Sequence, residues 1–261
     1  MATGQALDRR SLLRHAARFG LGYGALQLLG CGGSDATTAP ESGDDGTPNN
    51  NTGSCSRIPE ETAGPYPGDG SNGANVLNQT GVVRQDIRSS FAGLSGSADG
   101  VPLSVNLTLV NASTCAPLSG YAVYLWHCDR AGLYSLYSSG VTNQNWLRGV
   151  QAADSSGRLS FTSIFPGCYA GRWPHIHFEV FRSVALAGAF TNRIATSQLA
   201  LPKASCDTVY AQSGYASSRT NLAGITLATD NVFSDGSNLQ LATVTGDTNG
   251  MVASLTVAVT G

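Results

Sequence analysis

The residues with the clearest chemical signal are two histidines separated by a single residue. His175 and His177 lie in the stretch HIHFEVF, whose composition is typical of a β-strand. Side chains two positions apart on a strand point to the same face, about 6–7 Å apart along the backbone. Two imidazoles in this arrangement can bind one metal ion, although the pattern also fits two histidines that bind no ligand.

Two tyrosines lie in loops that can reach the same strand face. Tyr169 precedes His175 by six residues in PGCYAGRWPHIHF, where prolines and glycines predict a bent loop. Tyr134 lies in DRAGLYSLY, just after a turn that follows an apolar run. Such loops can place both phenol groups near the two imidazoles.

Tyrosine oxygens favour ferric iron among the common metals. The ordinary pKa of tyrosine is about 10, so a strong Lewis acid must displace the proton before the phenolate binds. Fe(III) does this well, whereas zinc prefers histidine, cysteine or carboxylate. Ferrous oxygenases typically use two histidines and one carboxylate. Glu179 lies on the same strand face as His175 and could supply that carboxylate, so a ferrous site is an alternative.

The elements that must position these residues are mostly strands. Alternating or continuous apolar runs predict strands at 101–110, 121–128, 158–165, 175–181 and on both sides of the turn at 247–250. The run at 121–128 is nearly all apolar, which is typical of a strand buried on both faces. One short helix is predicted within 204–213, and an irregular loop at 62–73. We therefore expect an all-β chain, a β-sandwich core with long functional loops and little helix.

The first 30 residues are predicted to be an export signal rather than part of the fold. Arg9 and Arg10 form a twin-arginine pattern, and the apolar stretch that follows is too short for an ordinary membrane span. Residues 28–31 (LLGC) resemble a bacterial lipoprotein cleavage site. We expect twin-arginine export to a periplasmic or cell-surface location, with a lipid anchor on Cys31 as the sole membrane contact. A simple signal peptide with a chance cysteine is the alternative.

The remaining residues divide into a tether and one domain. Residues 31–54 lack periodicity and bulky apolar side chains, which predicts a flexible tether. Residues 55–261 form the predicted domain, and a hydrophobic content of 41% is ample for its core. Only 12% of the residues are charged and the net charge is −2, so we expect no nucleic-acid partner.

Cysteine usage predicts disulfides but no particular pairing. An exported protein meets an oxidising compartment, where disulfides form and persist. With Cys31 assigned to lipid, five cysteines remain, and the odd number leaves at least one thiol free. The five are Cys55, Cys115, Cys128, Cys168 and Cys206.

Five motifs resemble those of the intradiol ring-cleavage dioxygenases, the family of protocatechuate 3,4-dioxygenase and catechol 1,2-dioxygenase. They are TAGPY (62–66), DIRSSF (86–91), WHCDRAGLYS (126–135), WLRGVQAADSSGRLSF (146–161) and IFPGCYAGRWPHIHFEV (164–180). Their order and spacing agree with the family from residue 62 onward. The resemblance implies a β-sandwich and a non-haem Fe(III) ion bound by Tyr134, Tyr169, His175 and His177.

The resemblance also implies an activity. The expected reaction is cleavage of a catechol-type aromatic diol by O2, giving a muconate-type diacid. Arg172 corresponds to an arginine beside the substrate ring and is expected to stabilise negative charge, while Tyr66 corresponds to a pocket residue. Tyr169 can be displaced by the diol and take up a proton. The preferred diol and the oligomeric state are left open, and an exported, non-catalytic β-sandwich binding module is the alternative function.

Three further residues are assigned structural roles. His127 lies inside the apolar run and is expected to be a hydrogen-bonded core histidine rather than a ligand. Arg148 and Asp154 are expected to form a charge pair between strands. Cys168, next to Tyr169, is expected to be buried or disulfide-bonded.

Overall fold

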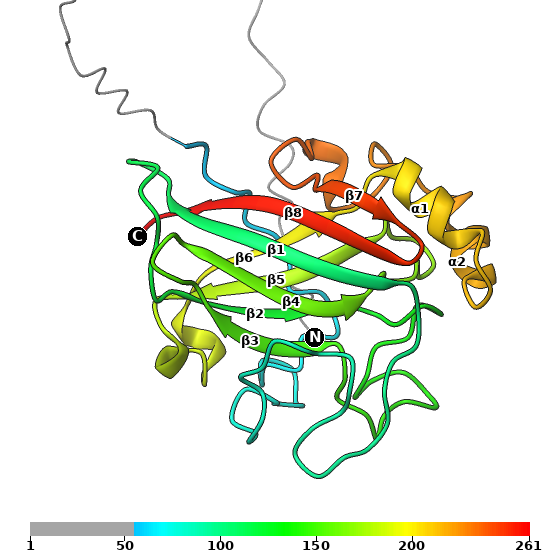
Figure 1. Ribbon diagram of the computed structural model, residues 1–261, viewed down its shortest axis with the longest axis horizontal. Coiled ribbons are helices and arrows are strands. Elements are labelled where there is room, and N and C mark those ends of the chain that lie inside the picture. The colour runs from blue at the N-terminus through cyan, green and yellow to red at the C-terminus, as the bar shows by residue number, and fades with distance from the viewer. Residues whose placement is uncertain (1–54) are drawn as a thin grey trace, which may run out of the picture. The chain divides into compact units, whose positions relative to one another are not determined.

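The computed structural model describes residues 55–261. The predicted export signal (1–30) and tether (31–54) lie outside these residues and stay predictions. Figure 1 looks onto one sheet, with a second sheet behind it.

Two four-stranded sheets form the frame of the described domain. The first sheet has the order β4 (Arg158–Ile164), β1 (Pro102–Asn111), β8 (Gly250–Val259), β7 (Thr243–Asp247). The second has the order β3 (Arg148–Ala152), β2 (Ala122–Trp126), β5 (His175–Phe181), β6 (Arg193–Ala200). All neighbouring strands are antiparallel except β1 and β8, which pair in parallel. The prediction of an all-β sandwich is confirmed.

The main core lies between the two sheets. Alternate residues of β1 point inward, so that Leu103, Val105, Leu107 and Leu109 are at most 2% exposed. They belong to one cluster with residues of the second sheet, among them Val123, Leu125, Ile176, Phe178 and Val180. Full burial of one such side chain stabilises the fold by roughly 1.5–3 kcal/mol.

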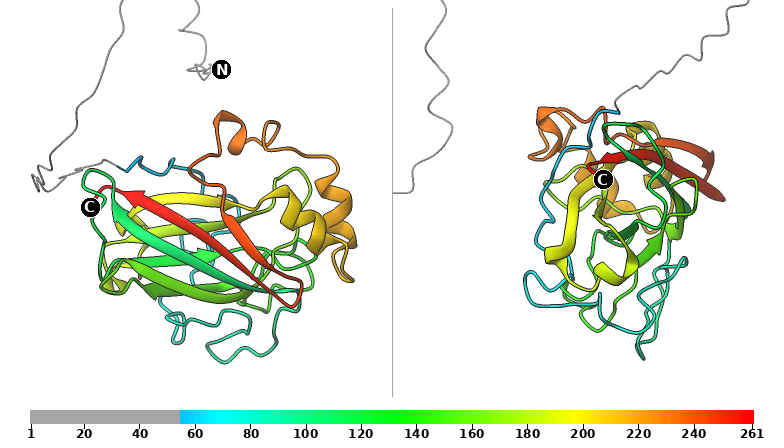
Figure 2. Two further views of the ribbon diagram at one scale, coloured as in Figure 1. Left: turned by 45° about the horizontal axis from the view of Figure 1, so that its top comes forward. Right: turned by 90° about the vertical axis from the view of Figure 1, so that its left-hand side faces the viewer.

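The outer face of the second sheet is also covered. All residues of β2 and β5 are buried, which confirms the prediction of a strand buried on both faces at 121–128. On this face Tyr124 and Trp126 pack with Val76, Leu77 and Val82 of the preceding loops. The right view of Figure 2 shows the blue and cyan N-terminal segment running along the outer side of the yellow strand β6. Loops rather than a third sheet therefore enclose the face that carries His175 and His177.

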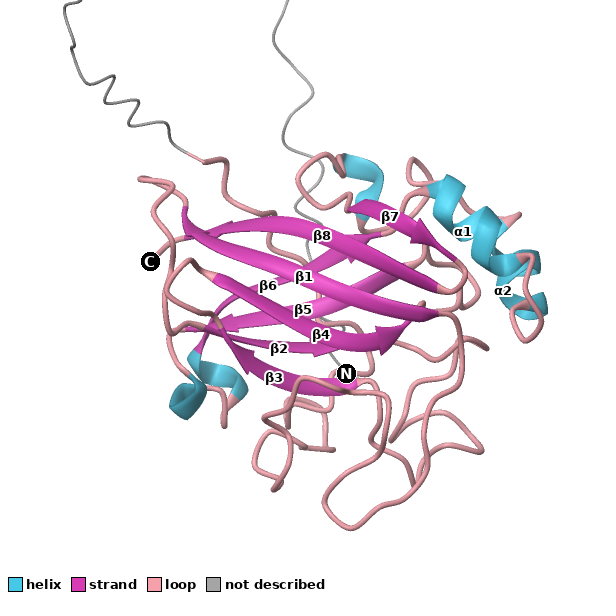
Figure 3. Ribbon diagram, viewed as in Figure 1, coloured by secondary structure: helices cyan, strands magenta, loops and turns pink. Residues whose placement is uncertain are grey.

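Helix is confined to short segments outside the sheets, as Figure 3 shows. The helices are α1 (Lys203–Tyr210) and α2 (Ala216–Leu222), with single 3₁₀ turns η1 (Val184–Leu186), η2 (Phe190–Asn192) and η3 (Phe233–Asp235). The first confirms the helix predicted within 204–213. The second was not predicted, because its sequence ASSRTNL has only Ser218 and Leu222 on its buried side and lacks apolar periodicity. No helix among the residues that the structure describes is long and apolar enough to cross a membrane.

One disulfide links the beginning of the described chain to the turn after β1. Cys55 pairs with Cys115, at a sequence separation of 60. The thiols of Cys128, Cys168 and Cys206 are free and buried. The odd number of cysteines predicted at least one free thiol, and Cys168 is buried as expected. The sequence did not predict which cysteines form the disulfide.

We expect the double variant Cys55→Ser/Cys115→Ser to be less stable than the wild type by up to about 4 kcal/mol, because the disulfide restricts a long loop in the unfolded chain. Chemical denaturation without reductant measures the difference in the free energy of unfolding. As a control, adding reductant should lower the stability of the wild type but leave the double variant unchanged. Equal denaturation midpoints for both proteins would contradict a stabilising role.

Candidate metal centre

The two predicted histidines meet at their Nε2 atoms. His175 and His177 lie on the outer face of β5, each 2% exposed. Their Nε2 atoms are 3.0 Å apart, and the ring planes are nearly perpendicular, at 81°. The two-residue period of the strand therefore directs both nitrogens to one point, as the spacing predicted.

The two predicted tyrosines complete a closed ring of four side chains. The centroid of Tyr134 is 6.2 Å from His177 and 5.7 Å from Tyr169. Tyr169 in turn is 5.7 Å from His175. Tyr134 comes from the loop after β2 and Tyr169 from the loop before β5. Segments far apart in sequence thus bring two phenols and two imidazoles together.

The histidine donors are neutral and oriented at neutral pH. Burial, together with the charge of Arg172, lowers the pKa of His175 to about 3. Burial and the neighbouring His175 lower the pKa of His177 well below its ordinary value. The Nδ1 atom of His175 donates a hydrogen bond to the carbonyl of Trp173, which leaves a lone pair on Nε2. Trp126 stacks on the ring of His177, with 4.9 Å between centroids and 3° between planes.

Polar atoms around the cluster lack partners within residues 55–261. The hydroxyl of Tyr134 is buried without a hydrogen bond, whereas the unpartnered Nδ1 atom of His177 lies on the other side of its ring from Nε2 and does not bear on an ion at Nε2. Burial raises the pKa of Tyr134 well above its ordinary value, so the phenol stays protonated unless a cation replaces its proton. An unpartnered buried polar group is costly, and an ion is one of the few explanations in a folded protein. The donor set therefore fits a metal ion.

Arg172 lies beside Tyr169 and is held by two buried partners. Its Nε atom donates to Asp230 at 2.9 Å, and Nη2 donates to the amide oxygen of Gln198 at 2.7 Å. Its Nη1 atom lies 3.4 Å from the hydroxyl of Tyr169. Sequence reasoning found Arg172 but missed Asp230 and Gln198, because nothing in their local sequences distinguishes them.

The segment before β1 covers the cluster. Gly64 adopts φ +70°, and a Cβ atom there would lie 3.2 Å from Cε1 of His177, so glycine allows the close approach. The ring of Tyr66 lies 4.9 Å from that of Tyr134 and is half-buried. Tyr66 therefore lies beside one of the predicted ligands.

Other residues singled out from the sequence are not part of the ring of four side chains. Glu179, the alternative ligand, has Arg193 as its ionic partner at 3.6 Å, and burial and the Asp69 carboxylate raise its pKa to about 8. His127 bonds to the carbonyl of Cys128 and the hydroxyl of Ser163, both at 2.7 Å. Burial lowers the pKa of His127 to about 4, so it is a neutral core histidine as expected.

The expected charge pair between Arg148 and Asp154 is wrong. Asp154 accepts hydrogen bonds from the backbone amides of Ser156 and Arg158 and caps the turn before β4. Arg148 is fully buried and donates to oxygens of other loops instead. Closeness in sequence suggested the pair, but the two residues lie at opposite ends of the β3 segment.

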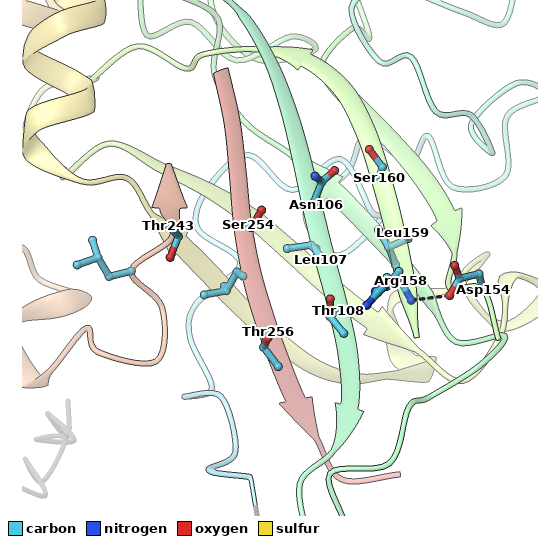
Figure 4. Close-up of a pocket in the computed structure, with 12 residues that line it drawn as sticks. Asn106, Leu107, Thr108, Asp154, Arg158, Leu159, Ser160, Thr243, Ser254 and Thr256 are labelled. Carbon is cyan, nitrogen blue, oxygen red and sulfur yellow. Dashed lines mark hydrogen bonds between the residues drawn. The ribbon is translucent and has the colours of Figure 1, made fainter. Parts of the chain in front are cut away.

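A surface hollow of about 710 Å³ lies on the outer face of the first sheet, away from these residues. Figure 4 shows its lining, in which threonine, serine and asparagine side chains mix with leucines, mainly on β1, β4 and β8. Its lining includes none of Tyr134, Tyr169, His175 and His177. The cluster on the second sheet is therefore the candidate site.

We expect Asp230→Asn to lower the free energy of unfolding by about 3 kcal/mol at neutral pH, because it leaves the buried Arg172 charge unpaired. Asp207→Asn, which breaks only an exposed pair with Lys203, is the matched control and should cost less than about 1 kcal/mol.

The effect of Asp230→Asn should depend on pH. Burial acts to raise the pKa of Asp230, but the bond from Arg172 and the backbone amides of Trp173 and Val232 bring it below its ordinary value. The stabilisation is therefore complete above about pH 4 and is lost as the pH falls through the folded-state pKa. Denaturation curves from pH 7 to pH 2 test this, and a difference that stays constant down to pH 2 would contradict it.

Comparisons with known proteins agree with this fold. A family model described as dioxygenase matches residues 79–216. The chain is similar to the structure of an intradiol ring-cleavage dioxygenase from Tetranychus urticae, with 23% identity over 78% of this chain and 95% of that chain and a TM-score of 0.61. It is also similar to the dioxygenase Tetur07g02040, with 23% identity over 78% of this chain and 94% of that chain and a TM-score of 0.62.

At this identity the structural likeness establishes the fold. No curated protein matches the sequence. Because the family model covers more than half of the chain, the chain belongs to the dioxygenase family, with the fold of the intradiol ring-cleavage enzymes.

Proposed function

We propose that this protein cleaves a catechol-type aromatic diol with O2 between its two hydroxyl-bearing carbons, giving a muconate-type diacid. The cofactor in this proposal is non-haem Fe(III), bound by Tyr134, Tyr169, His175 and His177. The observation that carries the proposal is the convergence of these four side chains, with the two imidazole Nε2 atoms 3.0 Å apart. Family membership supports the same chemistry.

The donor chemistry supports Fe(III) over other metals. Two neutral imidazoles and two phenols supply the ligands, and the phenols bind only as anions. Burial raises the pKa of both Tyr134 and Tyr169, so only a strong Lewis acid can replace their protons near neutral pH. Burial raises the pKa of the nearby Glu179 to about 8, so this side chain is mainly protonated at neutral pH, and it lies 3.6 Å from Arg193. Both features favour the tyrosine set over a site with two histidines and one carboxylate.

When bound, ferric iron supplies the Lewis acidity and electron transfer that make a diol reactive toward O2. The chain's own residues orient and protect this chemistry. Tyr134 is 1% exposed, whereas Tyr169 is only half-buried, so Tyr169 is the phenol that an incoming diol can reach. If the diol took the place of Tyr169, the Tyr169 oxygen could accept a proton from the diol.

Arg172 provides the positive charge on the substrate side. Asp230 and Gln198 fix two of its three nitrogens, and the remaining Nη1 atom faces the hydroxyl of Tyr169. A fixed donor costs no reorganisation during the reaction and can stabilise negative charge as it develops. Tyr66 lies beside Tyr134 and forms a side of the proposed pocket.

We expect the iron-loaded protein to be coloured by charge transfer from tyrosinate to iron. Tyr134→Phe and Tyr169→Phe should each weaken this absorption, because each removes one phenolate ligand. Tyr137→Phe is the matched control, since its hydroxyl bonds to Gly68 and Asn72 and lies outside the donor ring. Visible spectra and the ratio of iron to protein are measured, and undiminished absorption in either ligand variant would remove that tyrosine from the site.

We expect oxygen uptake with at least one diol from a panel of catechol, protocatechuate, hydroxyquinol and larger phenols. One O2 should be consumed per diol, and mass spectrometry should find an acyclic diacid. Arg172→Gln should lower kcat/KM by about 100-fold, because it removes charge stabilisation. Arg219→Gln, on the exposed side of α2, should leave kcat/KM unchanged. An iron-free, colourless protein that consumes no O2 would instead support the non-catalytic binding module.

A further inference from the structure

A single row of residues crosses the second sheet beneath the site. Arg148 pairs with Trp126 across β3 and β2, Trp126 pairs with His177 across β2 and β5, and His177 pairs with Gln198 across β5 and β6. Directly paired residues of neighbouring strands share one face of a sheet. All four side chains are at most 2% exposed. The candidate ligand His177 therefore lies within a row whose two end residues, Arg148 and Gln198, carry hydrogen-bond donors.

Both ends of this row bind the main chain of the covering segment. At one end Gln198 Nε2 donates to the carbonyl of Thr62 at 2.9 Å. At the other end Arg148 donates to the carbonyls of Tyr66 and Pro67, at 2.9 and 2.6 Å. Between these anchors the segment passes over His177 at Gly64. Hydrogen bonds at both ends of residues 62–67 thus fix the position of this segment over the candidate site.

Arg148 also holds the loop that carries Tyr134. Its Nε atom donates to the hydroxyl of Ser135 at 3.0 Å, and Nη2 donates to the carbonyl of Ser135 at 3.0 Å. Ser135 directly follows Tyr134. The same guanidinium therefore binds the main chain of Tyr66 and the neighbour of Tyr134, whose rings lie 4.9 Å apart.

The guanidinium uses its full set of donors in this position. A fifth hydrogen bond runs from Nη1 to the hydroxyl of Tyr124 at 3.2 Å, so five bonds match the five N–H groups. No carboxylate within residues 55–261 forms an ion pair with Arg148. A lysine would keep the charge but could not satisfy the same planar array. The role of Arg148 is therefore geometric and specific to arginine.

We propose that Arg148 is a positioning residue that sets the placement of the pocket residue Tyr66 relative to the ligand Tyr134, with Gln198 as the second anchor of residues 62–67. The part that concerns substrate and ligand rests on the proposed function. The hydrogen bonds from Arg148 to the main chain of residues 66 and 67 and to Ser135, called the clamp below, are a property of the folded chain. They can be tested separately.

Hydrogen exchange of the full-length protein, as isolated, tests the clamp. Arg148→Lys should speed amide exchange at least about tenfold in both 62–68 and 133–138, because both segments lose hydrogen bonds that Arg148 donates to their oxygens. Arg84→Lys is the matched control, since Arg84 also donates to main-chain carbonyls, at Ile87, Ser89 and Arg148, but touches neither segment. Faster exchange in only one segment, or throughout the domain to the same extent, would overturn the proposal.

The absorption band of the iron-loaded protein tests the link to the site. In Arg148→Lys the charge-transfer maximum should shift, because Tyr134 moves, whereas Arg84→Lys should keep the wild-type maximum. An unchanged maximum in Arg148→Lys would overturn the positioning of Tyr134. If neither the wild type nor any variant binds iron, the proposed function fails. The hydrogen-exchange result still decides whether Arg148 holds the two segments.

A milder variant covers the case in which Arg148→Lys does not fold. Ser135→Ala removes one hydroxyl, which accepts from Nε of Arg148 and donates to the carbonyl of Trp146. It should speed exchange about threefold in the same two segments, since the remaining bonds persist. Exchange at the wild-type rate in both segments would overturn the proposal.

Discussion

The side chains of Tyr134, Tyr169, His175 and His177 lie close together, and their polar atoms cannot all be satisfied by one another. The two neutral imidazoles can share one hydrogen bond at 3.0 Å, but the buried phenol of Tyr134 has no partner within the described domain. In the absence of a cation this arrangement costs free energy, because buried polar atoms lose the hydrogen bonds that water would give them. The surrounding structure holds the donors in place regardless, with Trp126 stacked on one imidazole and Trp173 bonded to the other. The sandwich supplies the stability that such a preorganised site needs.

Placing the donors on the outer face of a sheet has a structural requirement. A site on this face excludes water only if loops cover it, and those loops must be held in place by buried side chains. Buried arginines at its two sides meet this requirement in different ways. Arg172 is neutralised by the Asp230 carboxylate, whereas Arg148 binds only neutral oxygens, mainly of the main chain. The first arrangement fixes a positive charge beside the Tyr169 hydroxyl, and the second fixes the loops that cover the candidate site.

Local pattern was enough to predict six of the eight strands and the histidine pair, since both follow from the two-residue period of β structure. Strands β3 (RGVQA) and β6 (RIATSQLA) were not predicted, because neither has a clear run or alternation of apolar residues. The tyrosines came from loop motifs and a family resemblance, because no periodicity links Tyr134 to Tyr169. The sequence could not reveal Asp230 or Gln198 as partners of Arg172, since tertiary contacts between distant segments leave no local trace. For the same reason Arg148 was paired wrongly with Asp154, a neighbour in sequence rather than in space. The Cys55–Cys115 pairing likewise depends on a fold that brings the chain start to the end of β1.

The parallel pairing of β1 with β8 bears on how the protein reaches this state. Strand β8 lies between β1 and β7, and Leu103 pairs with Met251 across most of the described chain. The first sheet therefore cannot close around its core until residues 250–259 have been synthesised and have found β1. Pairings of such long range carry a large loop-closure cost, and chains dominated by them cross their folding barrier slowly. Until that moment the apolar inner face of β1 is exposed on a nascent chain, and this is the interval in which the protein is most open to aggregation or to a chaperone.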